Sequence, residues 1–261
     1  MKRMGFAILL LSWLVSGSAG AAATTVEHGP FTVDRVALLG LRGTLRVEVV
    51  AGATTTLHVE GPEAAVAALE VTEGGGGLEV RAPAGGNSVT VIRNLTVVTG
   101  PGASSSVTIG GAAGSAAETE PLDLVLELPK GTGLTLDGFV GEAEIGDLEA
   151  EVAIGVVEGR VTVGAVRSAG LATVGAATIG AASVDGDLEV SVTGDGAVEV
   201  AAGEVGAARL TLTGAGSITV DAPIETAEVS MVGAGTVRLA KVAAEPSVQR
   251  VGAGELHVGP P

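Results

Sequence analysis

The sequence predicts an all-β protein whose larger part is a parallel β-helix, or β-solenoid, with about 19–20 residues in each rung. Four copies of one pattern predict this fold. Each copy has two short strands, in which apolar and polar residues alternate, on either side of a Gly-x-Gly. Their first glycines are Gly194, Gly214, Gly233 and Gly252, at steps of 20, 19 and 19 residues. A step of this size leaves no room for a crossover helix between parallel strands, so the chain must return by coiling.

The alternation predicts which side chains face the core. Side chains on a strand point to opposite faces in turn, and a constant step stacks equivalent positions into columns. One expected column contains Val190, Leu210, Val229 and Val248. In another, Ile218 lies between Val198 and Val237. Each such side chain, once buried, contributes roughly 1.5–3 kcal/mol to stability.

The last copy departs from this pattern at Arg250, which falls in the column of Val192, Leu212 and Met231. A polar residue at that place is typical of a terminal repeat that caps the core. The alternative is a local slip of the register.

Residues 1–21 have the pattern of a secretory signal peptide. Lys2 and Arg3 precede an apolar run, Phe6 to Val15, which is too short to span a membrane. Ala19-Gly20-Ala21 is a small-residue cleavage site, and cleavage after Ala23 is an alternative. The chain has no cysteine, hence no lipid anchor and no disulfide, and no later segment is apolar enough to span a bilayer.

Residues 22–121 are expected to form a β-rich part without the repeat. Segments 44–49 and 56–60 predict a hairpin around Ala51-Gly52-Ala53, and residues 62–69 a short helix or loop. Gly74 to Gly77 predicts a turn before a strand at 78–81. Further strands are expected at 89–92 and 95–98, and a Gly-, Ala- and Ser-rich loop near 100–120 with a possible strand at 107–109.

Residues 122–261 are expected to form the regular coils, ending in a C-terminal cap. Leu122 to Leu128 alternates and is followed by a turn at Pro129-Lys130-Gly131, with further inward pairs expected at 134–136, 143–145, 152–154 and 161–163. Nineteen residues before Gly194 lies Gly175, which places Leu171 beneath Val190. A step of about 20 residues gives roughly seven rungs.

Three of these features together resemble the head GIN domain family, also described as an auto-transporter adhesin and long carried as a domain of unknown function. The first is the opening segment, with Phe31, Gly52, the His58-Val59-Glu60 strand and Leu78-Glu79-Val80. The second is the strand and turn at 126–131, and the third is the repeated Gly-Ala-Gly or Gly-Asp-Gly. The resemblance covers nearly all of the mature chain and implies an exported, right-handed β-helix.

The charge excludes some partners. The formal net charge is −16, and removal of Lys2 and Arg3 would leave 12 basic against 30 acidic residues. Such a surface disfavours nucleic acid and anionic lipid. We expect no nucleic-acid partner.

No motif indicates catalysis, a cofactor or a metal. His28, His58 and His257 are far apart in sequence, and a metal site needs several converging ligands. The chain has no Gly-x-Ser-x-Gly elbow and no phosphate-binding loop. Asp185, Asp187 and Asp195 could bind calcium, although turn positions explain them as well. Asn94-Leu95-Thr96 matches a glycosylation acceptor by pattern only.

Two functions fit these observations. The first is an exported, non-catalytic β-helix of the cell envelope, an adhesin-like structural or binding module whose partner is a protein or a glycan. The alternative is a carbohydrate-active β-helix enzyme, a polysaccharide lyase or hydrolase. Such an enzyme needs a cleft with paired carboxylates, or calcium with a basic residue, and its sugar platforms are usually aromatic. The chain has no tyrosine, and Trp13 lies in the signal peptide. The first function is therefore favoured.

Overall fold

The computed structural model describes residues 23–82 and 120–260. Of these residues, 74% lie in strands, and α1 is the one helix among them. The strands and the helix have the following bounds: β1 (Ala23–Phe31), β2 (Arg35–Leu39), β3 (Arg42–Val50), β4 (Thr55–Pro62), α1 (Glu63–Ala67), β5 (Glu70–Gly74), β6 (Gly77–Arg81), β7 (Leu122–Pro129), β8 (Gly133–Ile145), β9 (Glu151–Val166), β10 (Ser168–Gly175), β11 (Thr178–Val184), β12 (Leu188–Gly194), β13 (Ala197–Val200), β14 (Val205–Gly214), β15 (Ser217–Gly233), β16 (Thr236–Val242), β17 (Ser247–Gly252) and β18 (Glu255–Val258).

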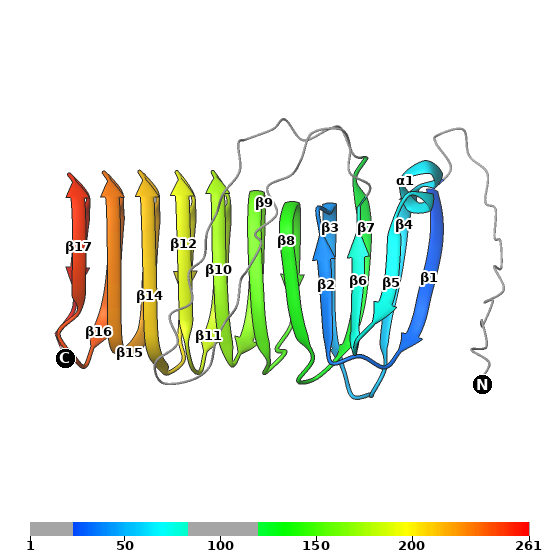
Figure 1. Cartoon of the computed structure of the whole chain (residues 1–261), viewed down its shortest axis with the longest axis horizontal. Coiled ribbons are helices and arrows are strands. Elements are labelled where there is room, and N and C mark those ends of the chain that lie inside the picture. The colour runs from blue at the N-terminus through cyan, green and yellow to red at the C-terminus, as the bar shows by residue number, and fades with distance from the viewer. Residues whose placement is uncertain (1–22, 83–119, 261) are drawn as a thin grey trace.

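The strands form a β-solenoid of about 7 turns, which confirms the predicted fold (Figure 1). Its hydrogen bonds run along two faces. Face I follows the order β1, β4, β7, β3, β8, β9, β11, β13, β15, β16, β18. Face II follows the order β5, β6, β2, β8, β9, β10, β12, β14, β15, β17. The long strands β8, β9 and β15 contribute to both faces, because each bends around an edge of the coil.

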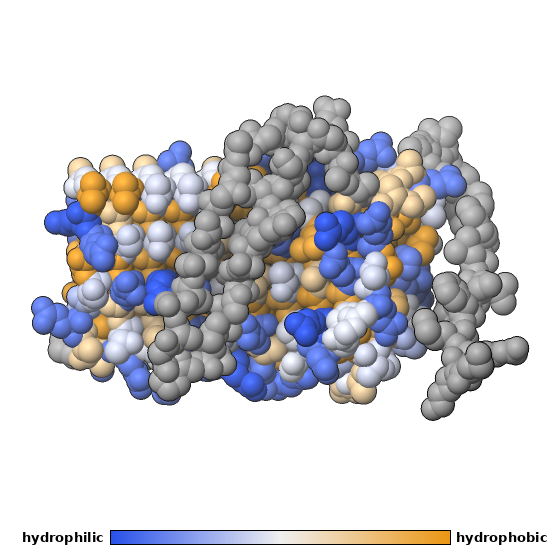
Figure 2. All heavy atoms as spheres, in the orientation of Figure 1, coloured by the Kyte–Doolittle hydropathy of each residue, from blue (hydrophilic) through white to orange (hydrophobic). Residues whose placement is uncertain are grey.

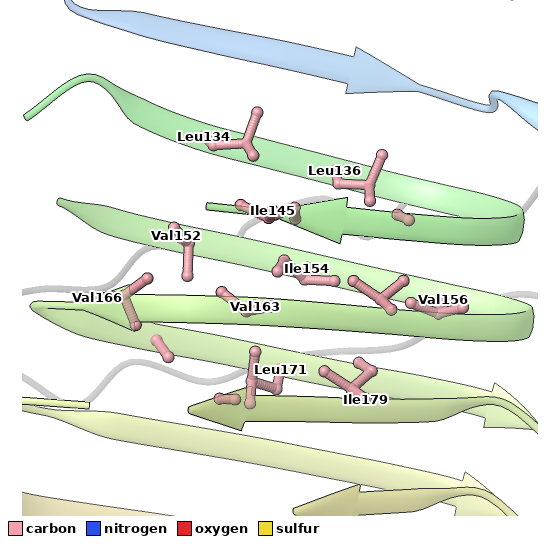
Figure 3. Close-up of a cluster of buried hydrophobic side chains, with 14 of the residues drawn as sticks. Leu134, Leu136, Ile145, Val152, Ile154, Val156, Val163, Val166, Leu171 and Ile179 are labelled. Carbon is pink, nitrogen blue, oxygen red and sulfur yellow. The ribbon is translucent and has the colours of Figure 1, made fainter. Parts of the chain in front are cut away.

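The core lies between these faces, and the predicted columns are confirmed. Val190 pairs with Leu210, Leu210 with Val229, and Val229 with Val248. The first three are each 1% exposed. Figure 3 shows how Leu136, Ile154 and Leu171 from successive rungs point into the space between the faces. Stacking therefore buries each inward side chain against the rung on either side.

The first glycine of each repeat forms a column of its own. Gly194, Gly214, Gly233 and Gly252 pair in sequence from rung to rung, with φ between +106° and +126°. A side chain at Gly214 would place its Cβ 2.4 Å from the carbonyl oxygen of Gly194. Both the backbone conformation and the close approach of the rungs therefore require glycine.

The N-terminal part differs from the sequence-based expectation at one place. The hairpin predicted for segments 44–49 and 56–60 is wrong, because β7 lies between β3 and β4. β7 is parallel to β3 and antiparallel to β4, so the hydrogen-bonded partner of each strand comes from 63 to 79 residues further along the chain. Local alternation identifies a strand but does not show which strand pairs with it.

Other local expectations for this part are confirmed. Residues 62–69 contain α1, and β5 and β6 form an antiparallel hairpin at the glycine turn. The face II pairing of β2 with β8 is parallel, so the coil's hydrogen bonding continues into the first part of the chain. The strands expected at 89–92, 95–98 and 107–109, the glycine-rich loop except its last residue, and the signal peptide lie outside the described residues.

At the C-terminal end the register does not slip. Pairs run without interruption from Glu228 with Ser247 to Gly233 with Gly252, and Met231 pairs with Arg250. The guanidinium of Arg250 is exposed, and its Nη1 donates to the carbonyl oxygen of Gly254 at 3.2 Å. A charged side chain is tolerated in this column because the last rung has core on one side only.

Candidate binding surfaces

Outward side chains stack in columns like the inward ones, and several columns contain opposite charges. On face II, Arg209 Nε lies 3.2 Å from Glu228 Oε2. On face I, Arg46 Nη2 lies 3.6 Å from Glu144 Oε2. Exposed pairs of this kind contribute only about 0–1 kcal/mol each. These pairs therefore contribute little to the stability of the fold.

One outward area of face II is free of charge. We call it the hydroxyl strip and define it by two adjacent columns of three residues each. The columns are Thr211, Ser230, Gln249 and Thr213, Val232, Val251. The next outward column, two residues before Thr211 and Ser230, contains the Arg209–Glu228 pair. The strip therefore has a charged border on that side. An uncharged strip on a protein of net charge −16 is suited to contact with another molecule, because its desolvation costs less than that of charged side chains.

The aspartates considered as calcium ligands bind backbone amides. Asp185 Oδ1 accepts from the amide of Glu204 at 3.2 Å, and Asp187 Oδ1 accepts from the amide of Ala207 at 3.3 Å. Asp147 does the same at another corner, accepting from the amide of Ala165 at 2.7 Å. These carboxylates join one rung to the next where the chain turns and regular strand bonding stops. Their geometry supports the interpretation as turn residues.

Asp195 does not join this group. It lies in the turn after β12, whereas Asp185 and Asp187 lie in the corner before that strand. A strand of seven residues separates the two places, about 20 Å at the usual rise. The fold therefore divides the acidic residues that the sequence places close together.

The three histidines are also divided. Glu27 pairs with His58 and His28 with Leu57 across β1 and β4, so His28 and His58 lie on neighbouring strands but on opposite sides. Burial lowers the pKa of His28. His257 lies at the other end of the coil, with Nε2 3.2 Å from Glu255 Oε2. In residues 23–82 and 120–260, no three His, Cys, Asp or Glu side chains converge as metal ligands would.

Sequence reasoning missed two features. The hydroxyl strip has a readable signal, since Thr211-Leu-Thr213 recurs as Ser230-Met-Val232 one rung later without a charge at either outward position. Asp147 has no such signal in the sequence, because its role depends on the amide of Ala165 in the next rung. Within the described part of the chain, no helix is long and apolar enough to cross a bilayer.

These features define a class, a β-solenoid protein whose outward side chains stack in columns; on the face in view, polar and apolar residues lie side by side (Figure 2). Within that class, the chain belongs to the family described as "Putative auto-transporter adhesin, head GIN domain", whose model matches residues 38–260. The resemblance inferred from the sequence is thereby confirmed. No curated protein shows significant similarity to the chain.

The chain is similar to solved structures, one of which has the same fold. A protein described as a "putative adhesin" from Bacteroides fragilis NCTC 9343 superposes with a TM-score of 0.63 at 13% identity, over 91% of this chain and 97% of that one. A "putative lipid binding protein" from Parabacteroides distasonis ATCC 8503 has a TM-score of 0.47 at 17% identity, over 90% of this chain and 96% of that one. At 13% identity, the likeness to the Bacteroides fragilis protein concerns the fold alone.

Proposed function

We propose that this protein is an exported, non-catalytic β-helix of the cell envelope that acts as an adhesin-like binding module. The hydroxyl strip is the observation that carries the proposal. Its hydroxyl, amide and methyl groups present donors, acceptors and apolar contacts in rows separated by one strand spacing, about 4.8 Å. A periodic surface of this kind fits an extended partner, either a glycan or a polypeptide strand of the envelope.

The absence of catalysis is part of the same proposal. A glycosidase needs two carboxyl groups about 5–10 Å apart across a cleft, both available to the sugar. Here the carboxylates of Asp185 and Asp187 are held by the amides of the next rung. Release of reducing ends or unsaturated sugars from a polysaccharide panel, lost on changing Asp185 and Asp187 together, would favour the enzyme instead.

Export follows from the basic start and apolar run of residues 1–21 and agrees with the adhesin-like family. The protein would then be periplasmic, attached to the cell surface or secreted. N-terminal sequencing of the mature protein should begin near Ala22 or Thr24. A protein recovered from the extracellular or periplasmic fraction with Met1 intact contradicts export.

Binding is tested by cosedimentation of the mature protein with the isolated envelope of the producing cell. A variant with Thr213→Glu and Gln249→Glu charges the hydroxyl strip without touching an inward column. We expect it to lose at least tenfold in binding, because the partner must desolvate the new carboxylates. The matched control is Thr219→Glu, an outward change on face I, which should bind as the wild type does. Equal binding by all three proteins would exclude the strip as the site.

A further inference from the structure

The two ends of the coil carry opposite charges. The elements at the N-terminal end, β1, α1 and β5, contain four acidic residues and neither lysine nor arginine. These residues are Glu27, Glu63, Glu70 and Glu73. Residues 236–260 at the C-terminal end contain three basic residues, Arg238, Lys241 and Arg250, and two acidic residues, Glu245 and Glu255. On a chain of net charge −16, the C-terminal end is thus an exception.

The C-terminal end also exposes apolar side chains. Four large apolar residues of the described chain are exposed, and all lie in its last two rungs: Val232, Val248, Val251 and Val258. Val248 and Val258 belong to inward columns, and they are 42% and 41% exposed. Their neighbours one rung earlier, Val229 and Leu239, are each 1% exposed. Val248 and Val258 are accessible only because no further rung covers them.

The N-terminal end closes differently. There α1 packs against β4 and β1, with Ala65 and Val66 buried. The outer side of the helix presents the exposed residues Glu63, Ala64 and Ala67. The helix thus exposes two small apolar side chains, Ala64 and Ala67, beside the carboxylate of Glu63. This end can accept the exposed valines of another molecule while its carboxylates face basic side chains.

Strand direction allows the sheets to continue across such a contact. β1 is antiparallel to β4, which is antiparallel to β7, so β1 runs in the same direction as β18 at the other end of face I. β5 is antiparallel to β6 and therefore to β17 on face II. Among the described residues, both ends thus have edge strands with unpaired backbone groups on both faces, and Figure 1 shows β1 and β17 at opposite extremes of the coil.

We infer that the C-terminal end of one molecule docks onto the N-terminal end of a second copy, head to tail. Opposite charges attract across this contact, whereas a symmetric contact of two C-terminal ends would bring the basic residues together. The contact joins two different surfaces and leaves one of each free, so it produces linear arrays. It does not depend on the ligand of the hydroxyl strip.

Sedimentation velocity of the mature protein at increasing concentration tests this inference. We expect a series of species that grows with concentration and shrinks as NaCl is raised from about 0.02 to 0.5 M, because salt screens the charges. Two variants each block one end. Val248→Asp adds an acidic group to the C-terminal end, and Glu63→Lys with Glu70→Lys reverses charges at the N-terminal end.

Alone, each variant should associate at least tenfold more weakly than the wild type. Mixed, they should form a one-to-one complex through the two unaltered ends. The control Thr162→Asp places the same charge at an exposed outward position of β9, in the middle of the coil, and should leave the arrays intact. Circular dichroism checks that each variant is folded.

A wild type that stays monomeric at all concentrations would overturn the inference, as would a mixture without the complex. If the lysine variant alone still formed dimers and Val248→Asp did not, the contact would be between two C-terminal ends, and the head-to-tail arrangement would be wrong.

Discussion

At the scale of single residues, the facing of a side chain determines the effect of a charge. Val229 is 1% exposed, between Leu210 and Val248, whereas its neighbour Ser230 faces outward. Val229→Asp places a carboxylate in an apolar column without a partner, and we expect it to cost several kcal/mol. Ser230→Asp should change stability by no more than about 0.5 kcal/mol. Denaturant melts measure both, and equal losses would contradict the register.

Thr173 places a polar group in an inward column of the native protein. Its side chain is fully buried in the column between Val156 and Val192, and within the described residues its Oγ1 has no hydrogen-bond partner. Valine has the same shape without the hydroxyl. Thr173→Val should therefore raise the free energy of unfolding by about 1 kcal/mol. The outward change Thr211→Val is the control and should have little effect on stability; a loss of stability in Thr173→Val would indicate a bond through ordered water.

At the scale of elements, the turn between two strands depends on its glycine. Gly214 has a φ of +124°, and an added Cβ would meet backbone atoms of Gly194. Gly180 lies in β11, where an added Cβ meets nothing within 4 Å. Gly214→Ala should cost about 2 kcal/mol or more, from strain and from separation of the rungs. Gly180→Ala should be neutral or stabilising by up to about 1 kcal/mol. Thermal unfolding of the two variants distinguishes them.

The elements also show how far sequence reasoning reaches. Strands 190–200 and 210–220 and their columns were predictable, because in a coil the partner of each residue lies one fixed step away. The pairing of β3 with β7 was not, since about 70 residues separate the strands and no period connects them. The same limit applied to the candidate sites. The bonds of Asp185 and Asp187 to the next rung depend on corner geometry that the spacing of the aspartates does not reveal.

At the scale of the whole molecule, each rung contacts only its neighbours. Stability therefore accumulates by stacking, and a rung with one neighbour is held less firmly than a rung with two. β17 shows this directly, because all six of its residues are exposed, whereas four of the seven residues of β12 are buried. The N-terminal end has α1 packed against β1 and β4, and the C-terminal end has no such element among the described residues. The coil should therefore open from its C-terminal end.

Hydrogen exchange of the dilute wild type, followed by mass spectrometry, measures this order. We expect amides of β17 and β18 to exchange first, those of β15 and β16 next, and those of β10 and β12 last, since opening of an inner rung requires the outer ones to be lost. At high protein concentration, docking of a second copy should slow exchange in β17 and β18 and leave β10 and β12 unchanged. Uniform exchange along the coil at low concentration would show that the rungs unfold as a single unit. The sequential model of opening would then be wrong, whatever the outcome at high concentration.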